Sequence, residues 1–571
     1  MESKNSSRKK NDLFFNIYRD RYLRSIIDYY QYITRPLTLS HLTQLNKLTV
    51  NEQTKGNHIC YNIDTRDKLT LYQSHSLSFL ITHLIVNIEF LSIVKETKKR
   101  NVVIYGLNIP PQPGLGDIIS IPDDIQYLRT TYPLLCKISK IPSTLTFLYL
   151  DLIYPTNVNH IPDCVKYLTI NCRRGYLHIS RGVIPSNVTS IRFECLGQTI
   201  RPHLFPLSVK YLWMPISNSL IEDSRSLPLQ VEYLNIGRKE LIPNLIPKTV
   251  RKLRCGNNSE KPIQVNSIPQ GVEFLYLSDS TKNLKLTPNA IPNGVSTLYF
   301  GKSYYHPLGQ EDIPESVTNL RLSNTFAKLS YIPSKIVSLE APNLFADTLP
   351  ILPPTLTSLV ATTSAIYKPI PLDYFPQQLT KLHFHVYQLE PHIVPSSVTN
   401  LSITTPSSLK LGSIPTSVQK LRIVSLAHIS VPQGVIPSSV VKLKLEFLIN
   451  NLSVIDVSSS VEYLYLQYNS EEIFTKATIT IPPNYPSSIK TLKLGRKIHS
   501  SSKFPSSLRH LKIDKSYIYH KDEFFQQNDQ LEIVEYFDGL DRVQYHRIKN
   551  DDKPILCEEY TKRTINFISD D

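Results

Sequence analysis

Apolar residues recur in this chain at fixed distances from a proline that opens each copy of a ten-residue phrase. Clear copies are "IPESVTNLRL" from Ile313, "VPSSVTNLSI" from Val394, "IPTSVQKLRI" from Ile414 and "IPSSVVKLKL" from Ile436. The third, sixth and eighth residues after the proline are mostly apolar; in the last copy they are Val440, Leu443 and Leu445. Alternation with a period of two predicts a short β-strand that buries one face.

The phrase forms an array of nineteen copies between Pro122 and Pro505, with a mean spacing of about 21 residues and with Ser458 in place of one proline. One short strand cannot cover its own apolar face, but identical strands stacked in parallel bury a continuous core. Proline can begin such a strand but cannot sit inside a ladder, because it has no N–H. The linking segments, such as "GKSYYHPLGQED", favour turns or short 3₁₀ pieces over helices.

The V-x-x-L-x-L pattern resembles the strand segment of a leucine-rich repeat. We therefore expect a repeat solenoid, mostly β: a leucine-rich-repeat-like right-handed coil with one short parallel strand per repeat and a helical N-terminal cap. The asparagine that forms a ladder in many leucine-rich repeats occurs in few copies (Asn258, Asn469).

The best copy, "IPNGVSTLYFGKSYYHPLGQEDIP" (Ile291–Pro314), resembles the FNIP-repeat family, whose phrase continues with Gly and then F-N-x-P-L. Gly301 holds the glycine place, and residues 304–308 hold the F-N-x-P-L places, although the F-N pair itself is degenerate throughout. The resemblance covers roughly residues 110–515. It implies a leucine-rich-like interaction scaffold and no known catalytic chemistry.

The ends of the chain leave the repeat. We expect a disordered basic N-terminus over 1–11, an N-terminal helical or capping region over 12–109, the repeat solenoid over 110–515, and a C-terminal cap with an acidic tail over 516–571. The first region carries one face of an amphipathic helix, formed by Phe15, Tyr18, Tyr22, Ile26, Tyr29 and Ile33. Its alternative role is to dock an adaptor, because some FNIP-repeat proteins carry an F-box; the L-P opening of that module is missing here.

Composition narrows the class of partner. The net charge of +15 over 571 residues favours acidic partners such as phosphorylated peptides, nucleic acid or anionic lipid, although a lysine-rich surface alone gives the same balance. Seven cysteines at irregular spacings support neither a disulfide framework nor a zinc site. The most apolar window, 78–94, contains His83, Asn87 and Glu89 and is predicted to be buried core instead of a membrane span. We expect a monomer in the cytoplasm, with the nucleus as the alternative.

No catalytic, cofactor-binding or metal-binding residues are predicted. "GVSTLYFGKS" has six residues between its glycines where a phosphate-binding loop needs four, and the repeat makes it a strand. His383 and His385 are separated by one residue, and no H-E-x-x-H, G-x-S-x-G or calcium-loop pattern occurs.

If the sixth and eighth positions point inward, the fifth and seventh point outward. Of these 38 positions, 12 are aromatic, 12 are Lys or Arg, and only Glu340 is acidic. Strand propensity alone explains the rings but not the missing acids. The predicted partner-binding residues are Tyr211, Trp213, Tyr233, Lys252, Arg254, Phe274, Tyr276 and Tyr299, with a second basic zone at Lys420, Arg422, Lys442 and Lys444.

These residues predict a non-catalytic protein-interaction scaffold that binds an acidic or phosphorylated protein segment on a concave strand face. Tyrosine, tryptophan and arginine are the residue types that dominate interface hot spots. Two alternatives stay open. The first is a substrate receptor of a ubiquitin ligase, and the second is single-stranded nucleic-acid binding through stacking and phosphate contacts.

Overall fold

The structure is a computed structural model of the 571-residue chain, and it divides into two compact units. It describes residues 37–39, 59–63, 66, 69, 83–97, 103–109, 119–152, 156–172, 177–195, 199–214, 220–221, 223–237, 241–256, 261–277, 285–301, 304, 306–322, 328–345, 349–426, 431–447, 457–468, 479–480, 486–495, 498–499, 504–514, 530–531, 533–538, 541–546 and 559–562.

The smaller unit comprises Met1–Ile153 and Pro162–Leu168. Its elements are β1 (Leu37–Leu39), β2 (Ile59–Ile63), β3 (His83–Asn87), η3 (Ile88–Phe90), α5 (Leu91–Thr97), β4 (Val103–Asn108), β5 (Tyr127–Thr130), α6 (Tyr132–Leu135) and β6 (Phe147–Asp151). Strands β1 to β6 pair in parallel, each with the next in the chain. The parallel ladder therefore begins before the first recognised repeat. The amphipathic helix predicted on Phe15 to Ile33 lies outside the described residues.

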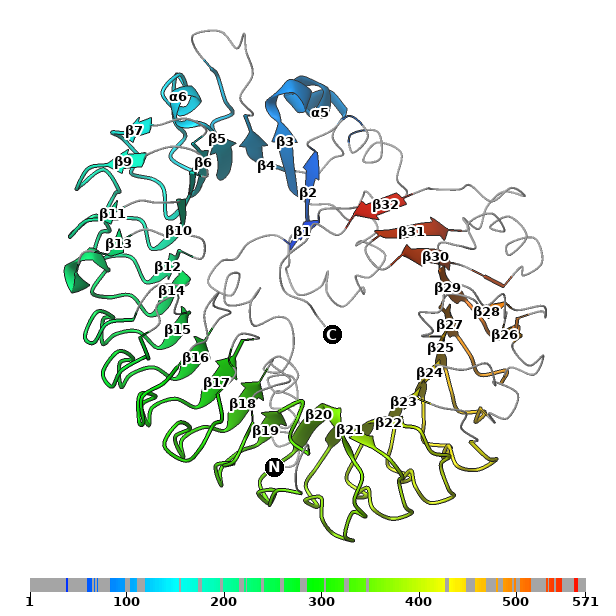
Figure 1. Cartoon of the computed structure of the whole chain (residues 1–571). Coiled ribbons are helices and arrows are strands. Elements are labelled where there is room, and N and C mark those ends of the chain that lie inside the picture. Colours follow the sequence, from blue (N-terminus) through cyan, green and yellow to red (C-terminus); the bar gives the residue numbers. More distant parts are fainter. Residues whose placement is uncertain are drawn as a thin grey trace, which may run out of the picture. The chain divides into compact units, whose positions relative to one another are not determined.

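The larger unit comprises Tyr154–Ile161 and Thr169–Asp571. Its main strands are β8 (Tyr167–Cys172, mostly in this unit), β10 (Ser190–Cys195), β12 (Tyr211–Trp213), β14 (Tyr233–Gly237), β15 (Lys252–Cys255), β16 (Phe274–Leu277), β17 (Thr297–Phe300), β18 (Asn319–Leu322), β19 (Ser338–Glu340), β20 (Ser358–Ile366), β21 (Lys381–Val386), β22 (Asn400–Thr405), β23 (Lys420–Ser425), β24 (Lys442–Phe447), β25 (Tyr463–Tyr468), β27 (Thr491–Leu494), β29 (His510–Asp514) and β30 (Ile533–Asp538). Each pairs with its neighbours along this series, as Figure 1 shows for β12 to β19. From β10 to β30 every pairing is parallel.

Shorter elements accompany this ladder. Three two-stranded parallel sheets pair β7 (Thr156–Val158) with β9 (Leu177–Ile179), β11 (Thr199–Ile200) with β13 (Leu220–Ile221), and β26 (Ile479–Thr480) with β28 (Ile498–His499). A 3₁₀ helix, η4, spans Ser224–Ser226. At the C-terminal end β31 (Asp541–His546) and β32 (Glu559–Lys562) add antiparallel strands to β30. The predicted parallel β-solenoid is confirmed.

The register follows the sequence pattern. In β15, Leu253 and Cys255 are fully buried, whereas Lys252 and Arg254 are half-buried on the opposite face. Leu253 pairs with Leu234 on one side and Leu275 on the other, so the sixth positions of successive copies stack into one inner column. The third position of the same copy, Val250, is also fully buried. The core is therefore continuous along the stack, as the repeat predicts.

A left-handed residue precedes many of the strands and explains part of the linker composition. Three residues before the proline, φ is positive at Gly182, His203, Asn244, Asn266, Asn289, Asp373, His392, Gly412 and Gly434. Glycine, asparagine and aspartate tolerate this conformation best. The turn also joins neighbouring coils, because the Asn244 N–H donates to the Asn266 carbonyl at 3.0 Å and the His392 N–H donates to the Gly412 carbonyl at 3.1 Å.

A hydroxyl ladder connects the coils at the second position after the proline. The Ser439 Oγ donates to the Val418 carbonyl at 2.8 Å, and the Thr355 Oγ1 donates to the Ile336 carbonyl at 2.7 Å. The same contact recurs at Thr144, Ser208, Thr249, Ser316, Ser397, Ser417, Ser460, Ser488 and Ser507. These hydroxyls satisfy buried carbonyls from coil to coil, the task that the asparagine ladder performs in many leucine-rich repeats.

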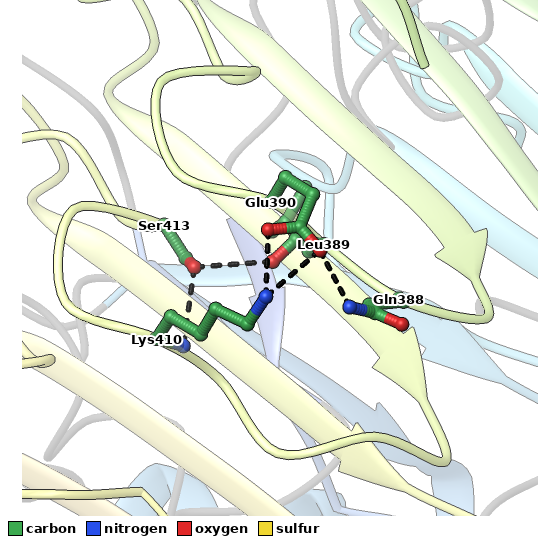
Figure 2. A network of polar contacts seen from close by, with 5 residues as sticks. All are labelled: Gln388, Leu389, Glu390, Lys410 and Ser413. Atoms are coloured by element: carbon green, nitrogen blue, oxygen red, sulfur yellow. Dashed lines mark hydrogen bonds and ion pairs between the residues drawn. The ribbon is translucent and has the colours of Figure 1, made fainter. Parts of the chain in front are cut away.

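Polar contacts also tie the linking segments together. Figure 2 shows Lys410, whose Nζ lies 2.9 and 2.7 Å from the two carboxylate oxygens of Glu390, and Gln388, which donates to the same carboxylate. Beside them, the Ser413 Oγ donates to the Leu389 carbonyl at 3.2 Å and accepts from the Lys410 backbone N–H. Ser413 is fully buried, so this hydroxyl fixes the turn, whereas the exposed ion pair of Lys410 and Glu390 contributes little to stability.

Candidate functional site on the strand face

The outward side chains of the strands form the candidate site, which we call the strand face. Two ladders run along it, because residues at the same repeat position lie opposite each other. The fifth-position ladder contains Tyr211, Tyr233, Lys252 and Phe274, and the seventh-position ladder contains Trp213, Asn235, Arg254, Tyr276 and Tyr299. Neighbouring rungs of a sheet are about 4.8 Å apart. The eight residues predicted for the first binding centre are therefore brought together on β12, β14, β15, β16 and β17.

Six rings among them form what we call the aromatic patch: Tyr211, Trp213, Tyr233, Phe274, Tyr276 and Tyr299. Trp213 and Tyr233 have ring centroids 6.3 Å apart, and Tyr299 packs edge-to-face on Phe274 at 5.4 Å and on Tyr276 at 6.5 Å. Edge-to-face pairs add to the stability of a sheet beyond their buried area. The rings remain partly exposed, so the patch also presents aromatic surface.

Two guanidinium groups contact rings of the aromatic patch. The guanidinium carbon of Arg254 lies 4.4 Å from the ring centroid of Tyr276, and Arg192 contacts Trp213 in the same way at 5.2 Å. Among the described residues, no carboxylate forms an ion pair with Arg254. Lys252 occupies the neighbouring fifth position, between Tyr233 and Phe274. The patch therefore combines aromatic surface with a guanidinium whose charge no described acid neutralises.

Asn235 is a residue of the strand face, beside the aromatic patch, that the sequence did not predict. It occupies the seventh position between Trp213 and Arg254, and it is buried although its strand neighbours on the face are half-exposed. Its Oδ1 accepts from the Gly237 N–H at 3.0 Å, while its Nδ2 has no hydrogen-bond partner among the described residues. Its position in the repeat was the available signal, because the seventh residue after the proline of each copy is expected on this face.

The basic zone consists of Lys420, Arg422, Lys442 and Lys444 on β23 and β24. Lys420 lies opposite Lys442, and Arg422 lies opposite Lys444, as the register predicts. The Lys442 Nζ lies 5.8 Å from the Tyr463 ring centroid, and the Lys444 Nζ lies 4.8 Å from that of Tyr465. The structure thus gathers all four predicted residues into one cluster.

Two of these four cations are already neutralised by Glu446. The Arg422 Nε and Nη2 donate to its two carboxylate oxygens at 3.0 and 2.8 Å, and the Lys444 Nζ lies 2.6 Å from Oε1. The Glu446 side chain is only 5% exposed. Burial acts to raise the pKa of Glu446, but the hydrogen bonds and charges of Arg422 and Lys444 outweigh it, so the pKa lies below its usual range.

Glu446 stands at the ninth position after the proline, which faces the same way as the seventh. The same position holds Asp151, whose Oδ2 lies 2.8 Å from Arg129, and Glu194, which is buried and paired with Arg192. These acids were missed because the face was counted only at the fifth and seventh positions. At the aromatic patch the ninth positions include Gly237, Gly256 and Gly301, which cannot neutralise a cation.

We also searched the described residues for metal sites, membrane-spanning helices and reactive thiols. They contain no group of three histidine, cysteine or acidic side chains arranged to hold a metal ion. None of the helices that the structure describes is long and apolar enough to cross a bilayer. A hydrogen bond with Cys195 lowers the pKa of the Cys172 thiol to about 7, but both thiols are buried on the core side of β8 and β10, away from the strand face.

Comparisons with known proteins gave one family model and several solved structures that are similar to parts of this chain. The family model described as FNIP Repeat matches residues 239–280 and 283–325, which include three of the six rings of the aromatic patch together with Lys252 and Arg254. A search of curated proteins gave no match.

Among solved structures, CroV588, a circular leucine-rich-repeat protein, is 19% identical with a TM-score of 0.48, and the match covers 78% of this chain but only 64% of that one. YopM from Yersinia enterocolitica is 17% identical, with a TM-score of 0.41 and coverage of 68% and 91%. A chain in the crystal structure of the mouse RP105/MD-1 complex is 12% identical, with a TM-score of 0.38, and the match covers 83% of this chain and 87% of that one.

The stacked parallel strands and the inward third, sixth and eighth positions define a repeat solenoid of the leucine-rich-repeat type. Two of its segments, residues 239–280 and 283–325, are similar to the FNIP repeat. Solenoids of this type generally serve as scaffolds for protein interactions, because their repeats build extended binding surfaces.

Proposed function

We propose that this protein is a non-catalytic scaffold that binds an acidic or phosphorylated protein segment on its strand face. The first binding centre is the aromatic patch together with Lys252 and Arg254, and Lys420 and Lys442 add a second. One observation carries the proposal: Arg254 lies against Tyr276, among the rings of the patch, with no carboxylate among the described residues to neutralise it.

The combination of rings and an unneutralised guanidinium favours a protein segment with negative charge. An arginine forms bidentate, charge-assisted hydrogen bonds with a carboxylate or a phosphate. The surrounding rings contribute apolar contact area with little loss of side-chain entropy, which is why such residues form hot spots. We assign no chemical step to this surface.

Affinity purification from the native cell tests the proposal when wild type is compared with a double variant, Arg254→Gln with Tyr276→Ala. We expect the wild type to recover a protein partner that the variant loses. Circular dichroism and thermal unfolding must first show that the variant remains folded. Retention of every partner by a folded variant would refute the assigned surface.

The same purification separates the alternative functions. Recovery of ligase adaptors by both proteins would indicate a ubiquitin-ligase substrate receptor that docks through the N-terminal region. Recovery of nucleic acid, with binding that falls steeply as salt increases, would indicate a nucleic-acid-binding protein, since release of counterions is the signature of phosphate contacts.

A further inference from the structure

The ion triad of Arg422, Glu446 and Lys444 resembles an occupied anion site. A carboxylate accepts two parallel hydrogen bonds from a guanidinium at 3.0 and 2.8 Å and lies 2.6 Å from an ammonium. This is the geometry with which such cations hold the carboxylate of a ligand. Here, however, the carboxylate belongs to the protein and lies on β24, two residues beyond Lys444 on the same face.

The cations of the triad remain accessible although their carboxylate does not. The side chains of Arg422 and Lys444 are 41% and 39% exposed, whereas that of Glu446 is 5% exposed. The cations therefore cover Glu446 and line the strand face. A negatively charged segment that lies on this face meets them with their charge already compensated.

The fifth-position cations beside the triad differ from Arg422 and Lys444 in their ion pairing. Lys420 and Lys442 lie opposite each other on β23 and β24, and no ion pair joins either of them to a described carboxylate. The Lys442 Nζ lies 5.8 Å from the ring centroid of Tyr463. The basic zone thus contains one neutralised pair and one pair whose charge stays available.

We propose that Glu446 is a built-in competitor that keeps Arg422 and Lys444 from binding the acidic segment, so that the basic zone binds through Lys420 and Lys442. Glu446 is therefore a residue that limits the affinity of the strand face for negative charge. The inference rests on the proposed function of that face, but it makes a separate claim about which cations serve it.

The test uses the full chain and a fluorescein-labelled octaglutamate peptide as the acidic probe, with binding followed by fluorescence anisotropy. Glu446→Gln removes the competing charge and retains the shape of the side chain. Glu462→Gln is the matched control, because it makes the same change in net charge at an exposed carboxylate that pairs with Lys490 at 2.7 Å. Lys420→Gln with Lys442→Gln tests the available pair.

Glu446→Gln is expected to tighten probe binding about three- to tenfold, as one or two new charge-assisted hydrogen bonds would, while Glu462→Gln changes it less than about twofold. Arg422→Gln should change the affinity little in the wild type and should remove the gain in the Glu446→Gln background. This double-mutant cycle assigns the gain to the released guanidinium instead of to net charge.

The outcomes separate the inference from the proposed function. Equal gains for Glu446→Gln and Glu462→Gln, with probe binding still lost in the Lys420/Lys442 variant, overturn the inference and leave the function standing. Binding by Glu446→Gln but not by the wild type would overturn the binding role inferred for Lys420 and Lys442 and would remove the wild-type basic zone from the function. Absence of binding in every protein overturns the inference and removes this zone from the function as well.

Discussion

The aromatic patch on β12 to β17 and the basic zone on β23 and β24 use the same repeat positions but treat their cations differently. In the patch, Arg254 lies against a ring and the ninth position of its own copy is Gly256. In the basic zone, the ninth position of the Lys444 copy is Glu446, which neutralises two cations. The net charge that one repeat copy contributes to the strand face therefore depends on the ninth residue after its proline as much as on the fifth and seventh.

The largest loss of stability is expected at the sixth repeat position, which points inward in both regions. Leu443→Asp should cost more than about 4 kcal/mol, because it buries an unpaired charge in the core, and Leu253→Asp should behave alike in the patch. Thermal unfolding measures both. The controls are Lys442→Asp and Lys252→Asp, which face outward and should remain folded. A folded Leu443→Asp protein with an unchanged melting temperature would contradict the register.

The next largest effect is expected at the entrance turn of one coil of the patch. The β24 coil of the basic zone has Ser439 at the second position, whereas the β17 coil of the patch has Gly294 there, and a Cβ on Gly294 would come 2.2 Å from the Gln270 carbonyl oxygen. Gly294→Ser therefore restores the common residue of the repeat but should destabilise the protein by about 1–3 kcal/mol. Chemical denaturation measures it, with Ser439→Gly as the reciprocal variant. A more stable Gly294→Ser protein would show that the two turns are interchangeable.

The ion triad in the basic zone predicts a pH-dependent contribution to the free energy of unfolding, and the aromatic patch has no such triad. Glu446→Gln should lower the free energy of unfolding by about 1–3 kcal/mol at pH 7, since hydrogen bonds to charged groups have this value. The folded pKa of Glu446 lies below its unfolded value of about 4.3, so the ionised carboxylate stabilises the fold above that pH. This contribution is lost as the pH falls through the folded pKa.

The measurement is denaturant unfolding of wild type and Glu446→Gln at a series of pH values. The gap between the two proteins should narrow below about pH 4. The exposed Glu462→Gln variant serves as the control and should show a gap of less than about 1 kcal/mol at any pH. A gap for Glu446→Gln that stays constant as the pH falls would contradict an ionised buried triad.

The repeat sufficed to predict the solenoid, the inward column of Leu253, Leu443 and their equivalents, and the two clusters on the strand face. It did so because the period of two and the spacing of about 21 residues leave one way to bury every copy. The hydroxyl ladder of Ser439 was not predicted, because its acceptor is the Val418 carbonyl in the preceding coil.

The neutralising role of Glu446 was missed for a related reason. Which cations an acid contacts depends on the direction of side chains across neighbouring strands, and the sequence pattern alone gives no such contact. Asn235 was passed over because its residue type is neither a ring nor a cation, although its position placed it between Trp213 and Arg254. The binding role of the twelve predicted residues stays a prediction.

The most direct test of the account is the affinity of the strand face for a fluorescein-labelled acidic peptide that contains one phosphotyrosine. It compares the wild type with Arg254→Gln and with Arg251→Gln, a control in the same coil whose Nη1 lies 3.8 Å from Glu273 at the edge of the strand face. We expect Arg254→Gln to weaken binding at least about tenfold, as loss of a hot-spot arginine does, and Arg251→Gln to change it less than about twofold. Equal effects of the two substitutions, or no binding by the wild type, would contradict the account.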